Sequence, residues 1–166
     1  MMGRHHARIL QSSPRVEFAG AIDPGGDRWG VVRDPSLVFA TIEEALAAGP
    51  IDLAIVAVPT EDHLPLARDL AGRGIHLLIE KPLAATVAEA REIMAACEAG
   101  GVRGAVGHVE RFNPALIELR RRIGEGQLGE IFLISTERVG PFPDRIRDVG
   151  VVKDLEIGRA SCRERV

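Results

Sequence analysis

The residues best suited to chemistry follow a short apolar run, 75–79, in the sequence Glu80-Lys81-Pro82. A lysine at the mouth of a strand, beside a glutamate and held by a proline, can bring its ammonium close to a ribose and to a substrate hydroxyl. Lys81 is therefore the first candidate for a catalytic group. A surface Lys-Pro turn explains the same residues without any chemistry, and spacing alone leaves both interpretations open.

Asp23 is the second candidate, because a carboxylate directly after a strand can accept hydrogen bonds from ribose hydroxyls. It lies about 20 residues beyond Gly3, the distance expected between such a carboxylate and the last glycine of a phosphate-binding turn. This arrangement favours NAD over NADP. The alternative is that the sequence Asp-Pro-Gly-Gly at 23–26 is only a turn.

Thr60 and His63 lie where another apolar run, 51–58, passes into a helix. Thr60 can cap that helix while the backbone of Pro59 and Thr60 lines a cofactor cleft, although capping alone explains the side chain. Helix-end chemistry likewise explains His63, and His5 and His6 are expected on a helix surface. No group of histidines, cysteines and carboxylates has structural-zinc spacing, so no metal is predicted.

The elements that must position these residues alternate β-rich runs with amphipathic helices, which is typical of a parallel sheet. Because ligands bind beyond the carboxyl ends of such strands, the candidates should meet at one edge. The sequence predicts an α/β fold, a Rossmann-type doubly wound parallel sheet followed by the start of a second α/β domain. Strands are expected at 16–22, 51–58, 75–79, 102–108 and 131–139, and helices after Thr41, Thr60, Thr86 and Asn113.

Both ends of the chain depart from this pattern. A Rossmann fold begins with a strand that feeds a glycine-rich turn, whereas this chain starts at the turn, so the sheet is expected to lack its first strand. Unpaired edge groups there would each cost roughly 1–3 kcal/mol if buried, which predicts a marginally stable polypeptide. Residues 156–166 have no apolar period and resemble a translated sequencing adapter. The expected divisions are an incomplete dinucleotide-binding domain at 1–111, the start of a substrate and oligomerisation domain at 112–155, and this artefactual tail.

Composition limits the partners. The chain has 166 residues, 46% of them hydrophobic, which suffices for one well-cored domain and part of another. A net charge of -3, with basic residues scattered among acidic ones, gives no footprint for nucleic acid. No apolar run approaches the roughly 20 residues that span a bilayer, so a cytoplasmic protein without a membrane partner is expected. Cys97 is expected to be an ordinary half-buried thiol.

Five motifs together resemble those of the Gfo/Idh/MocA oxidoreductases over nearly all of residues 2–155. The resemblance implies a Rossmann domain, a C-terminal α/β domain, and hydride transfer between a nicotinamide and a hydroxyl carbon of a sugar or a related compound. It implies NAD as the cofactor, with NADP not excluded, lined by Gly3, Asp23, Pro59, Thr60, His63, Glu80 and Lys81. The motifs are GRHHAR at 3–8, Asp23-Pro24, AVPT at 57–60 with His63, EKPL at 80–83 and GHVERFNP at 107–114.

The same resemblance assigns the catalytic residues. Lys81 would lie near the reacting hydroxyl, and Asp154 would begin an Asp-x-x-x-His motif in which the histidine is the general acid/base. Gly158 stands in that histidine's place, inside the adapter-like tail, so this chain is expected to be an inactive fragment of an active parent. An alternative from another class is a non-catalytic nucleotide-binding or regulatory protein, and a third is a sequencing fragment with no function of its own.

Basic residues near the C-terminal end bear on the substrate. Arg138, Arg145 and Arg147 lie in a segment that resembles a subgroup including UDP-N-acetylglucosamine 3-dehydrogenases. They would meet phosphates or ring hydroxyls of a nucleotide sugar, although a solvated strand edge explains them equally. The parent is expected to be a homo-oligomer, as is common in the family.

Overall fold

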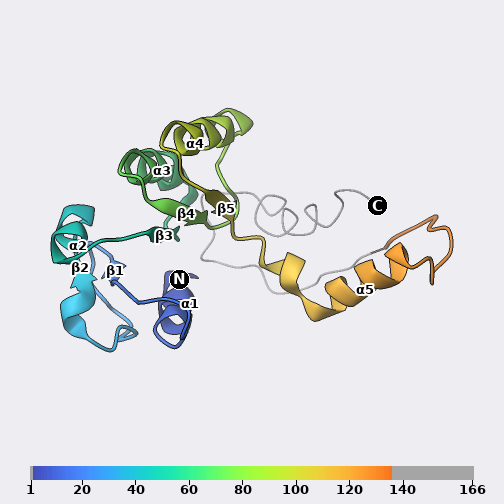
Figure 1. Ribbon diagram of the computed structural model, residues 1–166, viewed down its shortest axis with the longest axis horizontal. Coiled ribbons are helices and arrows are strands. Elements are labelled where there is room, and N and C mark those ends of the chain that lie inside the picture. The colour runs from blue at the N-terminus through green and yellow to red at the C-terminus, as the bar shows by residue number, and fades with distance from the viewer. Residues whose placement is uncertain (1, 136–166) are drawn as a thin grey trace.

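The computed structural model describes residues 2–135, in which helices alternate with short strands (Figure 1). This alternation confirms the predicted α/β class. Three 3-10 turns, at Pro35–Leu37, Thr60–Asp62 and Val109–Phe112, link the longer elements. In chain order the elements are α1 (Met2–Leu10), β1 (Ala21–Ile22), β2 (Val38–Phe39), α2 (Ile42–Ala48), β3 (Leu53–Val56), α3 (His63–Gly72), β4 (His76–Ile79), α4 (Val87–Ala99), β5 (Gly104–Val106) and α5 (Pro114–Gly124).

The strands form two parallel sheets, β1-β2 and β3-β4-β5. In the larger sheet Leu53 is opposite His76, and Leu77 is opposite Gly104. Within residues 2–135 no ladder joins β1 to β3. In the Rossmann order 3-2-1-4-5-6 these five strands take the places 3-2 and 4-5-6. The two sheets therefore match the two halves of that order.

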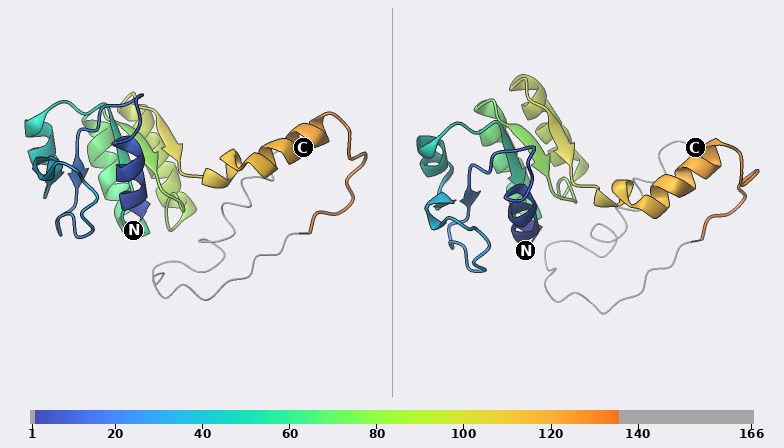
Figure 2. Two further views of the ribbon diagram at one scale, coloured as in Figure 1. Left: turned by 90° about the horizontal axis from the view of Figure 1, so that it is seen from below. Right: turned by 60° about the horizontal axis from the view of Figure 1, so that its bottom comes forward.

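The hydrophobic core lies between the three-stranded sheet and the helices α3 and α4. These two helices lie side by side on one side of the sheet, whereas α1 lies on the other side (Figures 1 and 2). Leu77 and Ile79 on β4 are each 1% exposed, and burying a side chain of this size stabilises the fold by roughly 1.5–3 kcal/mol. The other buried members are Val56, Ala67, Leu70, Ala71, Ile75, Ile93 and Cys97.

Three helix starts follow the predicted caps, which satisfy amide groups that have no partner inside the helix. The helix expected after Thr60 instead begins as a 3-10 turn, and α3 starts at His63 without a capping hydrogen bond from the side chain before it. At α4, Thr86 Oγ1 accepts a hydrogen bond from the Glu89 amide and the Glu89 carboxylate accepts one from the Thr86 amide, a complete capping box. At α2 the Thr41 hydroxyl accepts from the Glu44 amide. At α5 the Asn113 side chain accepts from the amide that follows Pro114.

Two expected strands differ from the structure. The run 16–22 is a strand only at Ala21–Ile22, and 131–135 contain no strand, while 136–139 lie outside the described residues. The physical reason is the same for both: an extended run stays a strand only if neighbouring strands complete its ladder. Phe132 and Leu133 are 87% and 83% exposed, so nothing in the described part of the chain packs on them.

The described part of the expected second domain is α5 with the residues up to 135. The helix extends away from the sheet (Figure 1) and contains no buried residue. Residues 136–155 and the expected tail 156–166 lie outside the described part. None of the helices in residues 2–135 is long and apolar enough to cross a membrane.

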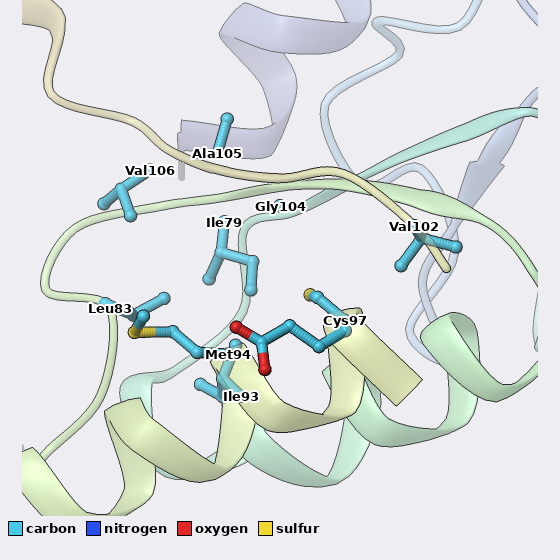
Figure 3. A pocket seen from close by; sticks show the side chains of 10 residues that line it. Ile79, Leu83, Ile93, Met94, Cys97, Val102, Gly104, Ala105 and Val106 are labelled. Carbon is cyan, nitrogen blue, oxygen red and sulfur yellow. The ribbon is translucent and has the colours of Figure 1, made fainter. Parts of the chain in front are cut away.

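Cys97 is a core residue, and the prediction of a half-buried thiol was wrong. Its side chain is 7% exposed and borders an apolar hollow of about 240 Å³ between α4 and β5 (Figure 3). A Cβ added at Gly104 would come within 3.0 Å of Cys97 Sγ, so the strand passes close to the sulfur. Burial raises the pKa of the Cys97 thiol, with a smaller contribution from the charge of Glu98.

Candidate functional site

The segments that contain the predicted site residues follow directly after the carboxyl ends of the strands. Main-chain hydrogen bonds continue the pairing between neighbouring strands into these segments. The amide of Asp23 donates to Phe39 O at 3.0 Å, that of Glu80 to Val56 O at 2.9 Å, and that of Gly107 to Ile79 O at 2.8 Å. Since all strands are parallel, these bonds hold the segments after β1, β4 and β5 at the carboxyl edges of the sheets.

Glu80 is the buried charged group of this edge, with a relative exposure of 6%. His6 Nε2 donates to Glu80 Oε1 at 2.7 Å, and the Lys81 amide donates to Glu80 Oε2 at 3.3 Å. Burial by itself would raise the pKa of Glu80, but the hydrogen bond and charge of His6, with smaller contributions from Lys81, hold that pKa below its ordinary value. Glu80 is therefore an ionised carboxylate that contacts the backbone of Lys81.

His6 is the residue that sequence reasoning missed, because its expected place on the helix surface was wrong. Its side chain is 18% exposed and bonded to Glu80. The signal was present in α1: Gly3, His6, Ala7 and Leu10 follow the i, i+3, i+4, i+7 spacing of a buried helix face, and all four are half-buried. A histidine on the inner face of a helix needs a polar partner, and Glu80 supplies it.

Gly107 shapes the same site by having no side chain. It follows β5 and is buried, and a Cβ at this position would lie 3.2 Å from both Cδ and Oε1 of Glu80. That distance is shorter than ordinary van der Waals contact, so a side chain here would require the Glu80 carboxylate to shift by a few tenths of an ångström. The motif at 107–114 does not reveal this contact, because Gly107 and Glu80 lie on different strand ends that meet only in the folded sheet.

Lys81 is half-buried, and its backbone is held on both sides. Its amide is bonded to the Glu80 carboxylate, and the peptide bond between Lys81 and Pro82 is cis. Pro82 itself is buried. The arrangement is more than a surface turn, because the residues on either side of the lysine are part of the interior.

His63 lies in the interior, 1% exposed, between the segments that follow β3 and β4. Its Nδ1 is 3.1 Å from Leu83 O and its Nε2 is 3.1 Å from Val58 O. A neutral imidazole carries one N–H and donates to one of these carbonyls at a time. The ring thus ties together the two loops that carry Pro59-Thr60 and Lys81, with Thr60 itself 7% exposed.

Asp23 has features of both alternatives drawn from the sequence, a carboxylate placed to bind a ribose and a residue that forms a turn. Its Oδ1 accepts a hydrogen bond from the Gly25 amide at 2.8 Å, and its carbonyl accepts from Gly26, so the turn is real. The residue is nevertheless exposed at the carboxyl end of β1. The turn fixes the carboxylate where an incoming hydroxyl can reach it.

Gly3 lies in the first turn of α1, whose leading amides have no partner within the helix. A Cβ built on Gly3 would meet only Ala57 Cβ, at 3.9 Å, an ordinary contact distance. The start of α1 therefore lies beside the residue that follows β3. Helix starts of this kind bind anions through their amides and through the helix dipole.

Several predicted features fall outside these observations. Asp154 and the basic residues Arg138, Arg145 and Arg147 lie beyond the described residues. Across residues 2–135, no group of three or more histidines, cysteines and carboxylates is arranged to hold a metal ion.

A parallel α/β sheet, a helix start at its carboxyl edge and an exposed carboxylate after a neighbouring strand define a dinucleotide-binding fold of the Rossmann class. Comparison with protein families identifies which one. Residues 1–108 match the GFO/IDH/MocA oxidoreductase family, described by its NAD-binding Rossmann fold. The chain belongs to this family.

Individual proteins extend the likeness. The rhizopine catabolism protein MocA of Rhizobium meliloti is 33% identical over 135 residues, which are 81% of this chain and 43% of MocA. UDP-N-acetylglucosamine 3-dehydrogenase of Acidithiobacillus ferrooxidans is 28% identical over 158 residues, 94% of this chain and 48% of that enzyme. The crystal structure of GenD2 from gentamicin A biosynthesis in complex with NAD matches with a TM-score of 0.66 and 29% identity, over 76% of this chain and 37% of GenD2. The chain spans less than half the length of these relatives.

Proposed function

We propose that the protein is an NAD(P)-dependent oxidoreductase that transfers a hydride between a nicotinamide and a hydroxyl carbon of a sugar or nucleotide sugar. The observation that carries this proposal is the pair of half-buried His6 and buried Glu80, which joins α1 to the segment that carries Lys81. The pair connects α1, whose first amides could bind a phosphate, with the segment of Lys81, whose ammonium could lie beside a reacting hydroxyl. The sugar class is supported by the likeness to UDP-N-acetylglucosamine 3-dehydrogenase.

The residues at the edge fit a dinucleotide. Gly3 leaves its side of the helix start open, so the amides of α1 can approach a pyrophosphate. The exposed Asp23 carboxylate can accept hydrogen bonds from the adenosine ribose, and its charge would repel a 2′-phosphate, which favours NAD over NADP. The backbone of Pro59 and Thr60 would line the cleft between the two ends, and His63 would support these loops from inside rather than touch the cofactor.

Lys81 is the proposed catalytic residue within the described part of the chain. A bound nicotinamide would accept or return the hydride. The Lys81 ammonium would lie by the substrate oxygen, stabilise negative charge as the hydroxyl proton leaves, and hold the sugar in register. Glu80 would hold the backbone of this lysine in place, because its carboxylate accepts a hydrogen bond from the Lys81 amide. Asp154 would orient the general acid/base of the family motif.

The activity, substrate and assembly of the whole protein belong to this proposal as well. Gly158 occupies the place where the family resemblance implies the general acid/base histidine, so we expect the 166-residue chain to bind cofactor without turning over substrate. The same glycine supports the second candidate, a non-catalytic nucleotide-binding or regulatory protein. A cytoplasmic location and a homo-oligomeric whole protein complete the proposal.

Cofactor binding can be tested with two matched variants, Asp23→Ala and Asp52→Ala. Both residues are exposed, but Asp52 precedes β3 and lies at the opposite end of the sheet. Hydrogen bonds to a charged group contribute about 1.5–3 kcal/mol, so Asp23→Ala should weaken NADH binding by about 10- to 150-fold and reduce the preference for NADH over NADPH. Asp52→Ala should bind as wild type. Titration followed by nicotinamide fluorescence gives both affinities, and equal effects of the two variants would contradict the assignment.

Turnover is tested separately, by adding sugars and nucleotide sugars to the whole protein with NAD⁺ and following the absorbance of NADH. Formation of NADH with a sugar supports the enzyme. Tight cofactor binding without reduction of NAD⁺ by any sugar, together with a parent sequence lacking the motif histidine, would favour the non-catalytic alternative.

A further inference from the structure

We propose that Trp29 and Arg4 form a stacking platform for the adenine base of the dinucleotide, an inference that rests on the proposed function. The Arg4 guanidinium carbon lies 5.2 Å from the centroid of the Trp29 ring, within the range of a cation–π contact. The pair joins the first turn of α1 to the loop that follows β1. Trp29 lies outside the motifs from which the sequence predicted the cofactor site, and Arg4, although part of the motif at 3–8, was given no role in that site.

Trp29 is exposed although its loop is well anchored. The indole is 62% exposed, which leaves most of a large apolar surface in water. Upstream, Asp27 accepts hydrogen bonds from the amides of Trp29 and Val32, at 3.2 Å and 2.7 Å. The fold thus fixes an aromatic side chain at the surface, as a binding site requires, instead of burying it.

A second anchor ties the far side of the loop to α1. The Gln11 side chain donates to Val31 O at 3.0 Å and accepts from the Arg33 amide at 2.8 Å. Arg33 in turn donates to Ser12 Oγ at 3.1 Å. The loop therefore runs along α1 from Arg4 in its first turn to Gln11 beyond its end, and the Trp29 ring is held at the end of the helix where phosphate would bind.

The position favours the adenine half of the cofactor. Arg4 directly follows Gly3, beside the proposed pyrophosphate site, and Trp29 belongs to the loop that begins with Asp23, the proposed ribose ligand. Turn hydrogen bonds from Gly26 to Asp23 O and from Arg28 to Gly26 O keep that loop compact. In a dinucleotide the adenine is attached to this ribose, so it must lie close to both elements.

The chemistry of the pair suits a purine next to a phosphate. An indole or a guanidinium plane stacks on any base, and stacking on an aromatic side chain contributes about 1–3 kcal/mol per base. The Arg4 charge adds an attraction for the neighbouring phosphate that an aromatic ring alone lacks. Adenine would therefore extend the Arg4–Trp29 stack.

Trp29 is the single tryptophan of the sequence, so its fluorescence reports this platform directly. AMP and ADP-ribose should quench it saturably in the 166-residue chain, whereas nicotinamide mononucleotide, which has no adenine, should leave it unchanged at equal concentration. Trp29→Ala should weaken NADH binding by about 5- to 150-fold, the range set by the stacking energy. Binding of reduced nicotinamide mononucleotide should not change.

Two further variants keep the result interpretable. Trp29→Phe retains a stacking ring and should recover most of the affinity, and Phe132→Ala removes another aromatic ring, 87% exposed, without effect. If NADH binds wild type and Trp29→Ala equally and AMP leaves the fluorescence unchanged, the platform is wrong while the proposed function stands. If a folded chain binds neither NADH nor AMP, the proposed function fails with it. A fluorescence change that depends on protein concentration and not on nucleotide would assign Trp29 to a contact between copies and overturn the inference.

Discussion

His6 Nε2 and Glu80 Oε1 lie 2.7 Å apart, so two side chains 74 positions apart in the sequence join α1 to the end of β4. A carboxylate accepts but cannot donate, so the ring nitrogen that faces it carries the proton. Glu80 is also bonded to the amide of Lys81, the proposed catalytic residue. Any change in the pair should therefore be felt both in stability and at the reacting end of the site.

Replacing His6 by alanine tests the structural part of this relationship. Glu80 would stay buried without its strongest partner, and leaving a buried polar group unsatisfied costs about 1–3 kcal/mol of unfolding free energy. His5→Ala is the matched control, because the His5 side chain, next to His6 in α1, makes no such hydrogen bond to the sheet. Urea unfolding at neutral pH measures both. Equal losses for the two variants would show that the pair contributes nothing specific.

The pair also predicts how stability depends on pH. The folded-state pKa of Glu80 is held below its ordinary value of 4.5, so this carboxylate stabilises the folded state fully at pH values above about 4.5. The contribution is lost as the pH falls through the lower, folded-state pKa. Wild type should lose more unfolding free energy than Glu80→Gln between neutral pH and this acidic range. A parallel pH dependence of the two proteins in urea unfolding would contradict the shift.

Gly3→Ala should change stability and cofactor affinity in opposite directions. The added methyl meets only Ala57 at an ordinary distance, and alanine is favoured over glycine within a helix by about 0.5–1 kcal/mol, so the fold should be slightly stabilised. The methyl would, however, keep a pyrophosphate away from the helix start, and NADH binding should weaken severalfold or more.

Gly124→Ala provides the comparison for Gly3→Ala. It lies at the end of α5, where an added Cβ meets nothing within 4 Å. This variant should leave NADH binding unchanged while its stability equals or exceeds that of wild type. Loss of cofactor binding in both variants, or in neither, would remove the phosphate site from the start of α1.

Cys97 should react slowly with thiol reagents while the protein is folded. Its sulfur is buried against β5 and its pKa is raised by burial, so little of it is the reactive thiolate at neutral pH. Cys162 is the second cysteine of the sequence, so it is replaced by serine in this test. The reaction of Cys97 with a colorimetric disulfide reagent should then accelerate by orders of magnitude once urea unfolds the chain. A fast reaction without urea would place the thiol at the surface and contradict the described core.

Much of this arrangement could be predicted from the sequence, because strand ends and caps are local features. The apolar run before Glu80 and the caps expected at Thr41 and Thr86 identified the elements and the segments that carry the site. Parallel pairing then implied that those segments share an edge. Family motifs added roles for Gly3 and Asp23 that their local sequence alone left open.

The remainder depended on long-range contacts that periodicity does not encode. His6 lies next to another histidine, and only the position of β4 shows that it faces Glu80. The sequence does not predict a role for the exposed Trp29, because the proposed role depends on its contact with Arg4 in another element. Strand lengths failed for a similar reason: the runs 16–20 and 131–135 have strand-like composition but no neighbouring strand among the described residues.

The enzyme itself is tested most directly by the rate of NADH formation by the whole protein with a sugar or nucleotide-sugar substrate, in wild type and in Lys81→Gln. Removing one donor that stabilises developing negative charge costs about 100- to 1,000-fold in rate, so turnover should fall by at least about 100-fold while NADH affinity falls far less. Lys81→Arg should not restore it, because a planar guanidinium cannot place its donors where the compact ammonium lies. Turnover of Lys81→Gln within a few-fold of wild type would contradict the role given to this lysine and to the edge of the sheet that carries it.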